Sequence, residues 1–143
     1  MAVKKEDSIF SDSRSYREVD HLPYLKRPPA LFEDEAEAAY QQTRLLCAAC
    51  GHPVTNVGEK TDIFGRHAHA FPYFNQVVQL GCYLNAPGAL GVERISYGYS
   101  WFRGYAWQIQ VCEKCYTQLG WKYSSPTDSF FGLVFKTLRE ETQ

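Results

Sequence analysis

Apolar and polar residues alternate along the second half of the chain, a pattern typical of β-strands that bury one face. The segment GYAWQIQVC (104–112) shows it most clearly, because every second position is apolar or aromatic: Tyr105, Trp107, Ile109 and Val111. Further β-branched and aromatic runs are bounded by glycine, proline or asparagine. These runs are TDIF (61–64), VVQLGCYL (77–84), VERISYGY (92–99), LGWKY (119–123) and FFGLVF (130–135). The sequence therefore predicts an all-β body.

The N-terminal part of the chain has a different pattern. Residues 1–29 are polar and charged and end in LPYLKRPP, which predicts a flexible or surface-lying arm. Residues 30–46 predict a helix, since prolines precede them, acidic residues fill the first turns and Arg44 lies near the end.

Length, composition and charge limit the classes of function. The 143 residues suffice for one domain, and 45% hydrophobic residues can form its core. A net charge of −1 argues against a nucleic-acid partner and against binding to anionic lipid. No apolar run reaches the ~20 residues that a membrane span needs. The N-terminal segment has no apolar stretch after its lysines and so is not a secretory signal, which favours a cytoplasmic location.

Four of the five cysteines form two CxxC pairs, Cys47 with Cys50 and Cys112 with Cys115, and 61 residues separate the pairs. Zn²⁺ prefers four tetrahedral ligands, and the thiolates of two CxxC turns supply this set. The sequence therefore predicts one structural zinc ion that joins two distant parts of the β fold. Disulfides or unligated cysteines are the alternative, and disulfides would suit a short secreted domain better.

The remaining cysteine and a histidine pair carry weaker signals. Cys82 lies in an apolar run, which predicts a small core residue. His67 and His69 could form a second metal pair on a strand face, although a solvated loop is the preferred interpretation.

The three tryptophans, Trp101, Trp107 and Trp121, lie close together around the second cysteine pair. A hairpin there would place Val111 opposite Leu119, Ile109 opposite Trp121 and Trp107 opposite Tyr123. Aromatic rings would then share one face, with Trp101 folding over from the preceding turn. Such a cage would hold a small flat ligand through dispersion and ring-edge contacts. From periodicity alone, rings that only fill a core are an equally good interpretation.

The segment SWFRGYAWQIQVCEKC (100–115), followed by LGWKY (119–123), resembles the CULT domain family, the thalidomide-binding domain of cereblon. The similarity is greatest to its stand-alone, single-domain bacterial members. It spans residues 44–138 and implies an N-terminal extension over 1–43 and a C-terminal tail over 139–143. It also implies a β-tent, in which two antiparallel sheets meet at an angle and a structural zinc joins them at one end. The Lon-like and helical regions of full-length cereblon have no counterpart, so no ubiquitin-ligase adaptor is expected.

The resemblance also implies a ligand site. In the family, three tryptophans and a fourth aromatic residue enclose the glutarimide ring of thalidomide-type drugs, uridine-like pyrimidines, or C-terminal cyclic imides on damaged proteins. These positions correspond to Trp101, Trp107, Trp121 and Tyr123. The backbone carbonyl of Tyr99 and the backbone N–H of Trp101 would read the imide edge. Tyr99 stands where the family often has His, and Asn85 matches the asparagine of an Asn-Pro loop whose proline is displaced by one position.

Three functions can be compared on these residues. A binding module is favoured, because a plain core does not need a tryptophan in a Ser-Trp-Phe-Arg-Gly turn. A structural or protein-interaction zinc domain of the Yippee type, with the aromatic residues as core, is the alternative. A B-type methionine sulfoxide reductase would need a nucleophilic cysteine after the second pair, and none follows Cys115. We therefore expect a binding protein rather than an enzyme.

Overall fold

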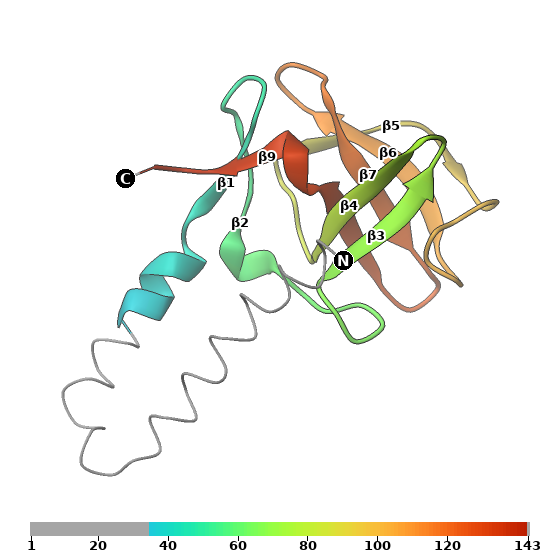
Figure 1. Ribbon diagram of the computed structural model, residues 1–143, viewed down its shortest axis with the longest axis horizontal. Coiled ribbons are helices and arrows are strands. Elements are labelled where there is room, and N and C mark those ends of the chain that lie inside the picture. Colours follow the sequence, from blue (N-terminus) through green and yellow to red (C-terminus); the bar gives the residue numbers. More distant parts are fainter. Residues whose placement is uncertain (1–34, 143) are drawn as a thin grey trace, which may run out of the picture.

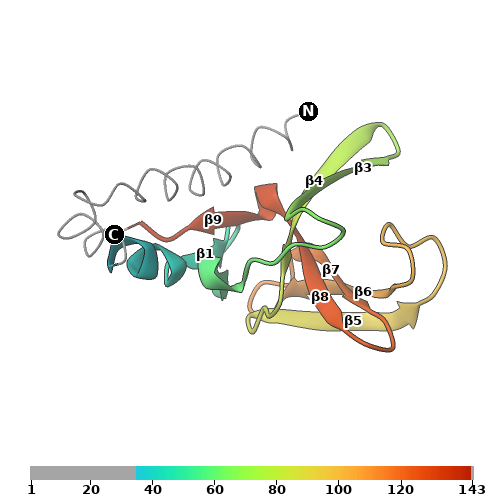
Figure 2. The ribbon, with the colours of Figure 1, turned by 90° about the horizontal axis from the view of Figure 1, so that it is seen from below.

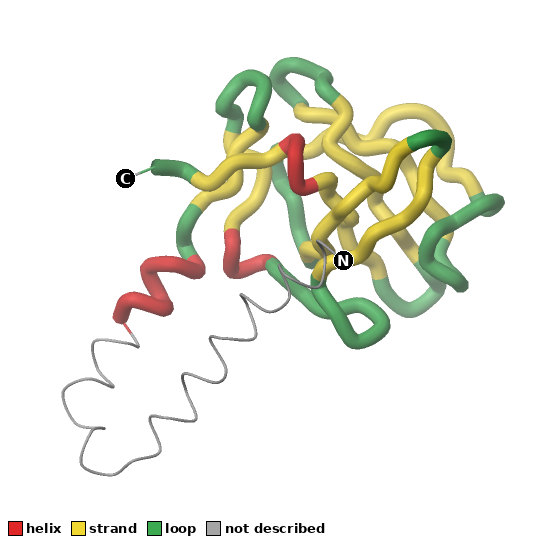
Figure 3. The backbone as a smooth tube through the Cα atoms, viewed as in Figure 1, coloured by secondary structure: helices red, strands yellow, loops and turns green. Residues whose placement is uncertain are grey.

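The computed structural model describes residues 35–142, and the predicted polar arm and the first five residues of the predicted helix, 30–34, lie outside this range. Strands make up most of the described chain (Figure 1, Figure 3). They are β1 Arg44–Cys47, β2 Pro53–Asn56, β3 Ala68–Tyr73, β4 Gln76–Tyr83, β5 Ala89–Ser96, β6 Ala106–Cys112, β7 Gln118–Ser124, β8 Ser129–Val134 and β9 Leu138–Glu140. Two short 3₁₀ helices, η2 Val57–Glu59 and η3 Phe135–Thr137, connect them. Within residues 35–142, no helix is long and apolar enough to cross a membrane.

Two antiparallel sheets form the body, as the resemblance to the CULT family implies. A three-stranded sheet has the order β2-β1-β9, and a six-stranded sheet has the order β3-β4-β8-β7-β6-β5. The small sheet lies at one end of the large one, and the β3–β4 hairpin splays away from the strands β5 to β8 (Figure 2). Each sheet buries apolar residues, one cluster lying beside the cysteines and a second lying beneath the aromatic residues.

The predicted hairpin between β6 and β7 is present. Trp107 pairs with Tyr123 and Ile109 pairs with Trp121, so the two predicted aromatic positions are confirmed. Val111, however, pairs with Gln118 rather than with Leu119, because the register shifts between Gln110 and Val111. The bulge turns Leu119 into the core beside the cysteines, where its side chain is fully buried.

Two predicted elements are wrong. The predicted helix over 30–46 ends early: residues 35–41 are helical, but residues 44–46 belong to strand β1. The predicted strand over 61–64 is a loop in which Ile63 forms an isolated bridge with Arg66, and Phe64 has a left-handed φ of 53°, outside the extended region.

Besides β1, three strands lie where the sequence analysis predicted none. They are β2, β3 and β9, and β9 continues beyond the predicted domain boundary at residue 138. The predicted solvated loop around the histidine pair is also wrong. His67 is buried, and His69 lies in β3, where its Nε2 atom is 3.0 Å from the carbonyl oxygen of Ile63.

Candidate metal centre and aromatic site

The four paired cysteines converge at the junction of the two sheets. Cys47 ends β1 and Cys50 lies in the turn that follows, whereas Cys112 ends β6 and Cys115 lies in the next turn. All four sulfur atoms lie within 4.8 Å of one another. One pair therefore comes from each sheet, so a metal ion held here would join the sheets.

The sulfur geometry fits a tetrahedral ion. Cys47 Sγ lies 3.7 Å from Cys115 Sγ, and Cys50 Sγ lies 3.6 Å from Cys112 Sγ. Four sulfurs at about 2.3 Å from a zinc ion would be about 3.8 Å apart along each edge of the tetrahedron. Among the described residues, this cluster is thus suited to hold one metal ion.

The two CxxC turns are closed by the same backbone hydrogen bond. The N–H of Gly51 donates to the carbonyl of Cys47 at 2.7 Å, and the N–H of Tyr116 donates to the carbonyl of Cys112 at 2.8 Å. Both donating residues have a left-handed backbone conformation, with φ of 82° for Gly51 and 64° for Tyr116. A side-chain contact between His52 Nε2 and Glu113 Oε2, 2.7 Å, links the two turns directly.

The pKa values of the neighbouring thiols move in opposite directions. Hydrogen bonding to Thr117, whose hydroxyl oxygen lies 3.2 Å from Cys115 Sγ, lowers the pKa of Cys115 to about 6. For Cys50, a backbone hydrogen bond at His52 lowers the pKa, but desolvation and the other sulfurs outweigh it and raise the pKa to about 12. Cys82, by contrast, is fully buried away from this cluster, and burial raises the pKa of its thiol to about 12. Cys82 is therefore a core residue, and its environment disfavours the nucleophilic thiolate.

The tryptophans surround a second, aromatic cluster on the large sheet. Trp101 and Trp121 meet edge to face, with ring centroids 5.0 Å apart and ring planes at 73°. The β6–β7 register puts Trp107, Trp121 and Tyr123 on one face of the sheet. All three tryptophans are only partly buried, and they pack against a core that includes Phe102.

Beneath the tryptophans lies a fully packed base. Tyr123 is 2% exposed, and its ring centroid lies 4.7 Å from that of Phe102 and 5.2 Å from that of Phe130. Burial raises the pKa of the Tyr123 phenol, so this ring stays neutral. The tryptophans are thus the accessible part of the aromatic cluster, and Tyr123 is its base.

The turn that carries Trp101 is held by its neighbours. The Ser100 hydroxyl accepts a hydrogen bond from the N–H of Phe102 at 3.2 Å and donates to its carbonyl at 3.0 Å. Phe102 is completely buried and fixes the turn to the core. Trp107 is fixed in turn, since its indole N–H donates to the carbonyl of Gly98 at 2.8 Å.

Two other predicted site residues have different surroundings. The Tyr99 side chain is fully exposed at a left-handed φ of 58°, so its phenol projects into solvent. Asn85 is exposed as well, and its described hydrogen bonds join it to Glu59 and Thr55, near the small sheet. These bonds do not connect Asn85 with the tryptophans.

The β3–β4 hairpin contributes aromatic rings that sequence reasoning missed. Phe71 stacks on Trp101, with centroids 4.8 Å apart and planes at 9°, and Tyr73 meets Trp101 edge to face at 5.9 Å. The alternation of small and aromatic residues in AHAFPY (68–73) was the available signal, but it does not reveal that this hairpin reaches Trp101.

Together, the two sheets, the four-cysteine centre at their junction and the partly buried tryptophans define a small β domain with a candidate metal centre and an aromatic site. No protein-family model matches the chain. It is 31% identical to protein cereblon of Gallus gallus over 111 residues, which cover 67% of this chain and 23% of the relative. It is also 31% identical to protein cereblon of Danio rerio over 93 residues, 58% of this chain and 20% of the relative. The chain carries a cereblon-like CULT domain and spans less than a quarter of the length of these relatives.

Proposed function

We propose that this protein is a binding module whose three tryptophans enclose a cyclic imide or a uridine-like ring, and that a single structural zinc ion holds its two sheets together. The observation that carries the proposal is the perpendicular packing of Trp101 against Trp121 above a buried base, with all three tryptophans partly accessible. A flat ring would gain dispersion contacts with the indole faces and lose water on both sides.

The burial pattern favours this function over a purely structural aromatic core. In a core, the largest rings would be fully enclosed, as Phe102, Phe130 and Tyr123 are here. The tryptophans instead lie on the outer side of these rings and keep surface exposed. A thiol-based enzyme is disfavoured, because all cysteines but the buried Cys82 belong to the metal centre.

The backbone near Trp101 is proposed to read the polar edge of the ligand. The carbonyl of Tyr99 would accept the imide N–H, and the N–H of Trp101 would donate to an imide carbonyl. This role uses only the main chain, so the solvent-facing phenol of Tyr99 is compatible with it. The ligand could be a free molecule or a modified chain terminus, since both present the same imide ring.

Calorimetric titration of the metal-loaded protein with glutarimide, N-methylglutarimide and uridine tests the proposal. Glutarimide has roughly eight heavy atoms. At about 0.8 kcal/mol of binding free energy per atom, the protein should bind it with a dissociation constant of about 10–20 μM. N-methylation removes the only donor and leaves a carbonyl unsatisfied, so it should abolish binding.

A pair of variants separates the cage from the rest of the surface. Trp107→Ala should weaken glutarimide binding by about 2 kcal/mol, or roughly thirtyfold, because it opens one wall to water. Tyr40→Ala, on the exposed helix, should leave affinity unchanged and serves as the matched control. Equal affinity for glutarimide and its N-methyl derivative, or full affinity in Trp107→Ala, would overturn the proposed function.

A further inference from the structure

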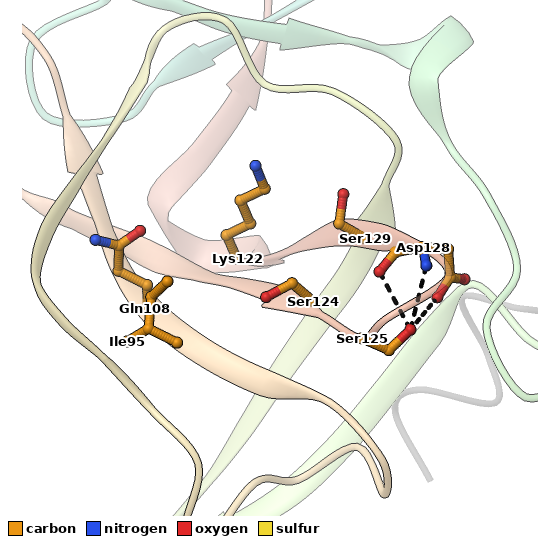
Figure 4. Close-up of a pocket in the computed structure, with 7 residues that line it drawn as sticks. All are labelled: Ile95, Gln108, Lys122, Ser124, Ser125, Asp128 and Ser129. Carbon is orange, nitrogen blue, oxygen red and sulfur yellow. Dashed lines mark hydrogen bonds between the residues drawn. The ribbon is translucent and has the colours of Figure 1, made fainter.

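A cavity of about 300 Å³ opens on the large sheet, and its lining includes no tryptophan. Figure 4 shows the residues that line it. Its wall includes Gln108 of β6, Lys122 and Ser124 of β7, and Ser129 of β8. Side chains alternate between the two faces of a strand, so Lys122 and Ser124 project opposite to Trp121 and Tyr123. The cavity and the aromatic cluster therefore lie on opposite faces of the same strands.

The strand register brings the polar side chains of this wall together. Gln108 pairs with Lys122 across β6 and β7, and Ser124 pairs with Ser129 across β7 and β8. Lys122 and Ser124 are two residues apart and so share a face. Figure 4 shows these side chains along one side of the sheet, with the Lys122 ammonium and the Ser129 hydroxyl pointing away from the strands.

Three donor groups of this wall form no hydrogen bond or ion pair with the described residues. The Lys122 ammonium lies over the Phe131 ring, 5.4 Å from its centroid, and no carboxylate between residues 35 and 142 forms an ion pair with it. The hydroxyls of Ser124 and Ser129 form no hydrogen bond with any described residue. Three neighbouring groups can therefore donate to a ligand.

The acidic residue at the rim is already engaged. Ser125 Oγ donates to one carboxylate oxygen of Asp128 at 2.8 Å, and the Tyr105 hydroxyl donates to the other at 3.0 Å. In Figure 4 the Asp128 carboxylate turns toward Ser125 and away from Lys122. Asp128 thus shapes the turn and does not neutralise the ammonium.

The amide of Gln108 is held in place at the opposite end of the cavity. Its Nε2 donates to the carbonyl of Glu93, 3.0 Å away, in the irregular part of β5. Ile95, from the same irregularity, adds an apolar wall. The cavity therefore combines one cation and two hydroxyl donors with the engaged Asp128 carboxylate at its rim and an apolar surface of similar extent.

We propose that this cavity binds the oxyanion group of a small molecule, a phosphate or a carboxylate, through Lys122, Ser124 and Ser129. An ammonium and two hydroxyls match the acceptor oxygens of such a group, and charge-assisted hydrogen bonds are among the strong polar contacts in proteins. The volume lies at the lower end of the range for small-molecule pockets. This site is separate from the aromatic cage and does not depend on the cage having a ligand.

Titration of the ¹⁵N-labelled, metal-loaded full chain with inorganic phosphate and, separately, with acetate tests the proposal, with ionic strength held constant by potassium chloride. Backbone amide shifts should saturate around Lys122, Ser124 and Ser129 with a dissociation constant tighter than about 10 mM. Saturation with phosphate alone would identify a phosphate-bearing ligand, and saturation with both anions would include carboxylates. Either result supports the oxyanion site.

Variants distinguish this site from general attraction of anions. Lys122→Gln and Ser129→Ala should each weaken binding by about tenfold, because each removes a donor to a charged group. Lys136→Gln, an exposed lysine outside the cavity, is the matched control and should bind as the natural chain does. Shifts that do not saturate with either anion, or equal affinity in Lys122→Gln and Lys136→Gln, would overturn the proposal.

Discussion

Mild acid should weaken the fold through the buried histidine just before β3. The ring of His67 packs edge to face on Tyr83, with centroids 5.1 Å apart, and lies 6.0 Å from the ring of Phe135. Burial lowers the pKa of His67 from 6.5 to about 4. The folded protein therefore resists protonation that the unfolded chain accepts.

The direction of the effect follows from proton binding. Above pH 6.5 the histidine is neutral in both states and contributes no pH dependence. Between pH 6.5 and about 4 the unfolded chain binds the proton and the folded protein does not, so stability falls as the pH falls through this window. Between about pH 7.5 and about pH 5, the loss in the free energy of unfolding should be about 2 kcal/mol.

Urea unfolding of the metal-saturated protein across this window measures the effect, and His67→Gln isolates it. Glutamine keeps an amide that can donate to the Thr61 carbonyl, which lies 3.1 Å from His67 Nδ1, but it takes up no proton. The variant should start less stable at neutral pH and then lose about 2 kcal/mol less on acidification. Acid also competes with the metal for thiolates, but that contribution is common to both proteins. Parallel stability curves for the two proteins would refute the reasoning.

Three further outcomes are expected. Cys112→Ser should lose both the bound metal and cooperative melting, because the ligand set has no spare member; one metal per chain with an unchanged melting curve would contradict this. A chain that begins at Ala30 should keep its glutarimide affinity, since the arm is polar and broken by prolines, and loss of affinity in a folded protein would show that the arm belongs to the site. Tyr99→Phe should change glutarimide affinity by less than about twofold, because its phenol is solvent-exposed; a tenfold loss measured by calorimetry would assign the phenol a direct role.

Sequence analysis predicted the strands in which apolar and polar residues alternate locally. In the seven residues of β6 and in those of β7, every second residue is apolar or aromatic. The two strands follow each other in the sequence and pair with each other. The pairing of Trp107 with Tyr123 could therefore be predicted from a hairpin alone. The bulge at Leu119 could not, because it depends on how the core near the cysteines accepts that side chain.

Strand β1 was mistaken for the end of a helix because one of its two partners, β9, is distant in sequence and the other, β2, gave no strand signal. The residues before Cys47 have adequate helix propensity, and nothing near them signals a strand. In the structure, Leu45 and Leu46 pair with β9 near the C-terminus, and Arg44 forms an ion pair with Glu141. Tertiary pairing across almost the whole described chain therefore overrides the local preference.

The aromatic site could be predicted only where it is built from one hairpin and its preceding turn. Trp101, Trp107 and Trp121 belong to that unit, and the structure places their side chains around a shared base. Phe71 and Tyr73 reach Trp101 from a hairpin that lies about thirty residues earlier. Contacts of that kind depend on the angle between parts of the sheet, which no local pattern records.

Strand β7 gives the two proposed sites a common structural basis. Its odd-numbered residues Trp121 and Tyr123 serve the aromatic cluster, and its even-numbered residues Lys122 and Ser124 serve the polar cavity. A slip of one residue in register would exchange the two faces and abolish both sites at once. Gly120 limits such a slip, because a Cβ atom there would lie 2.0 Å from the carbonyl oxygen of Gly132 on β8. Gly120 lies one residue after the bulge at Leu119. Its close approach to Gly132 thus fixes which side chains of β7 face the tryptophans and which face the cavity.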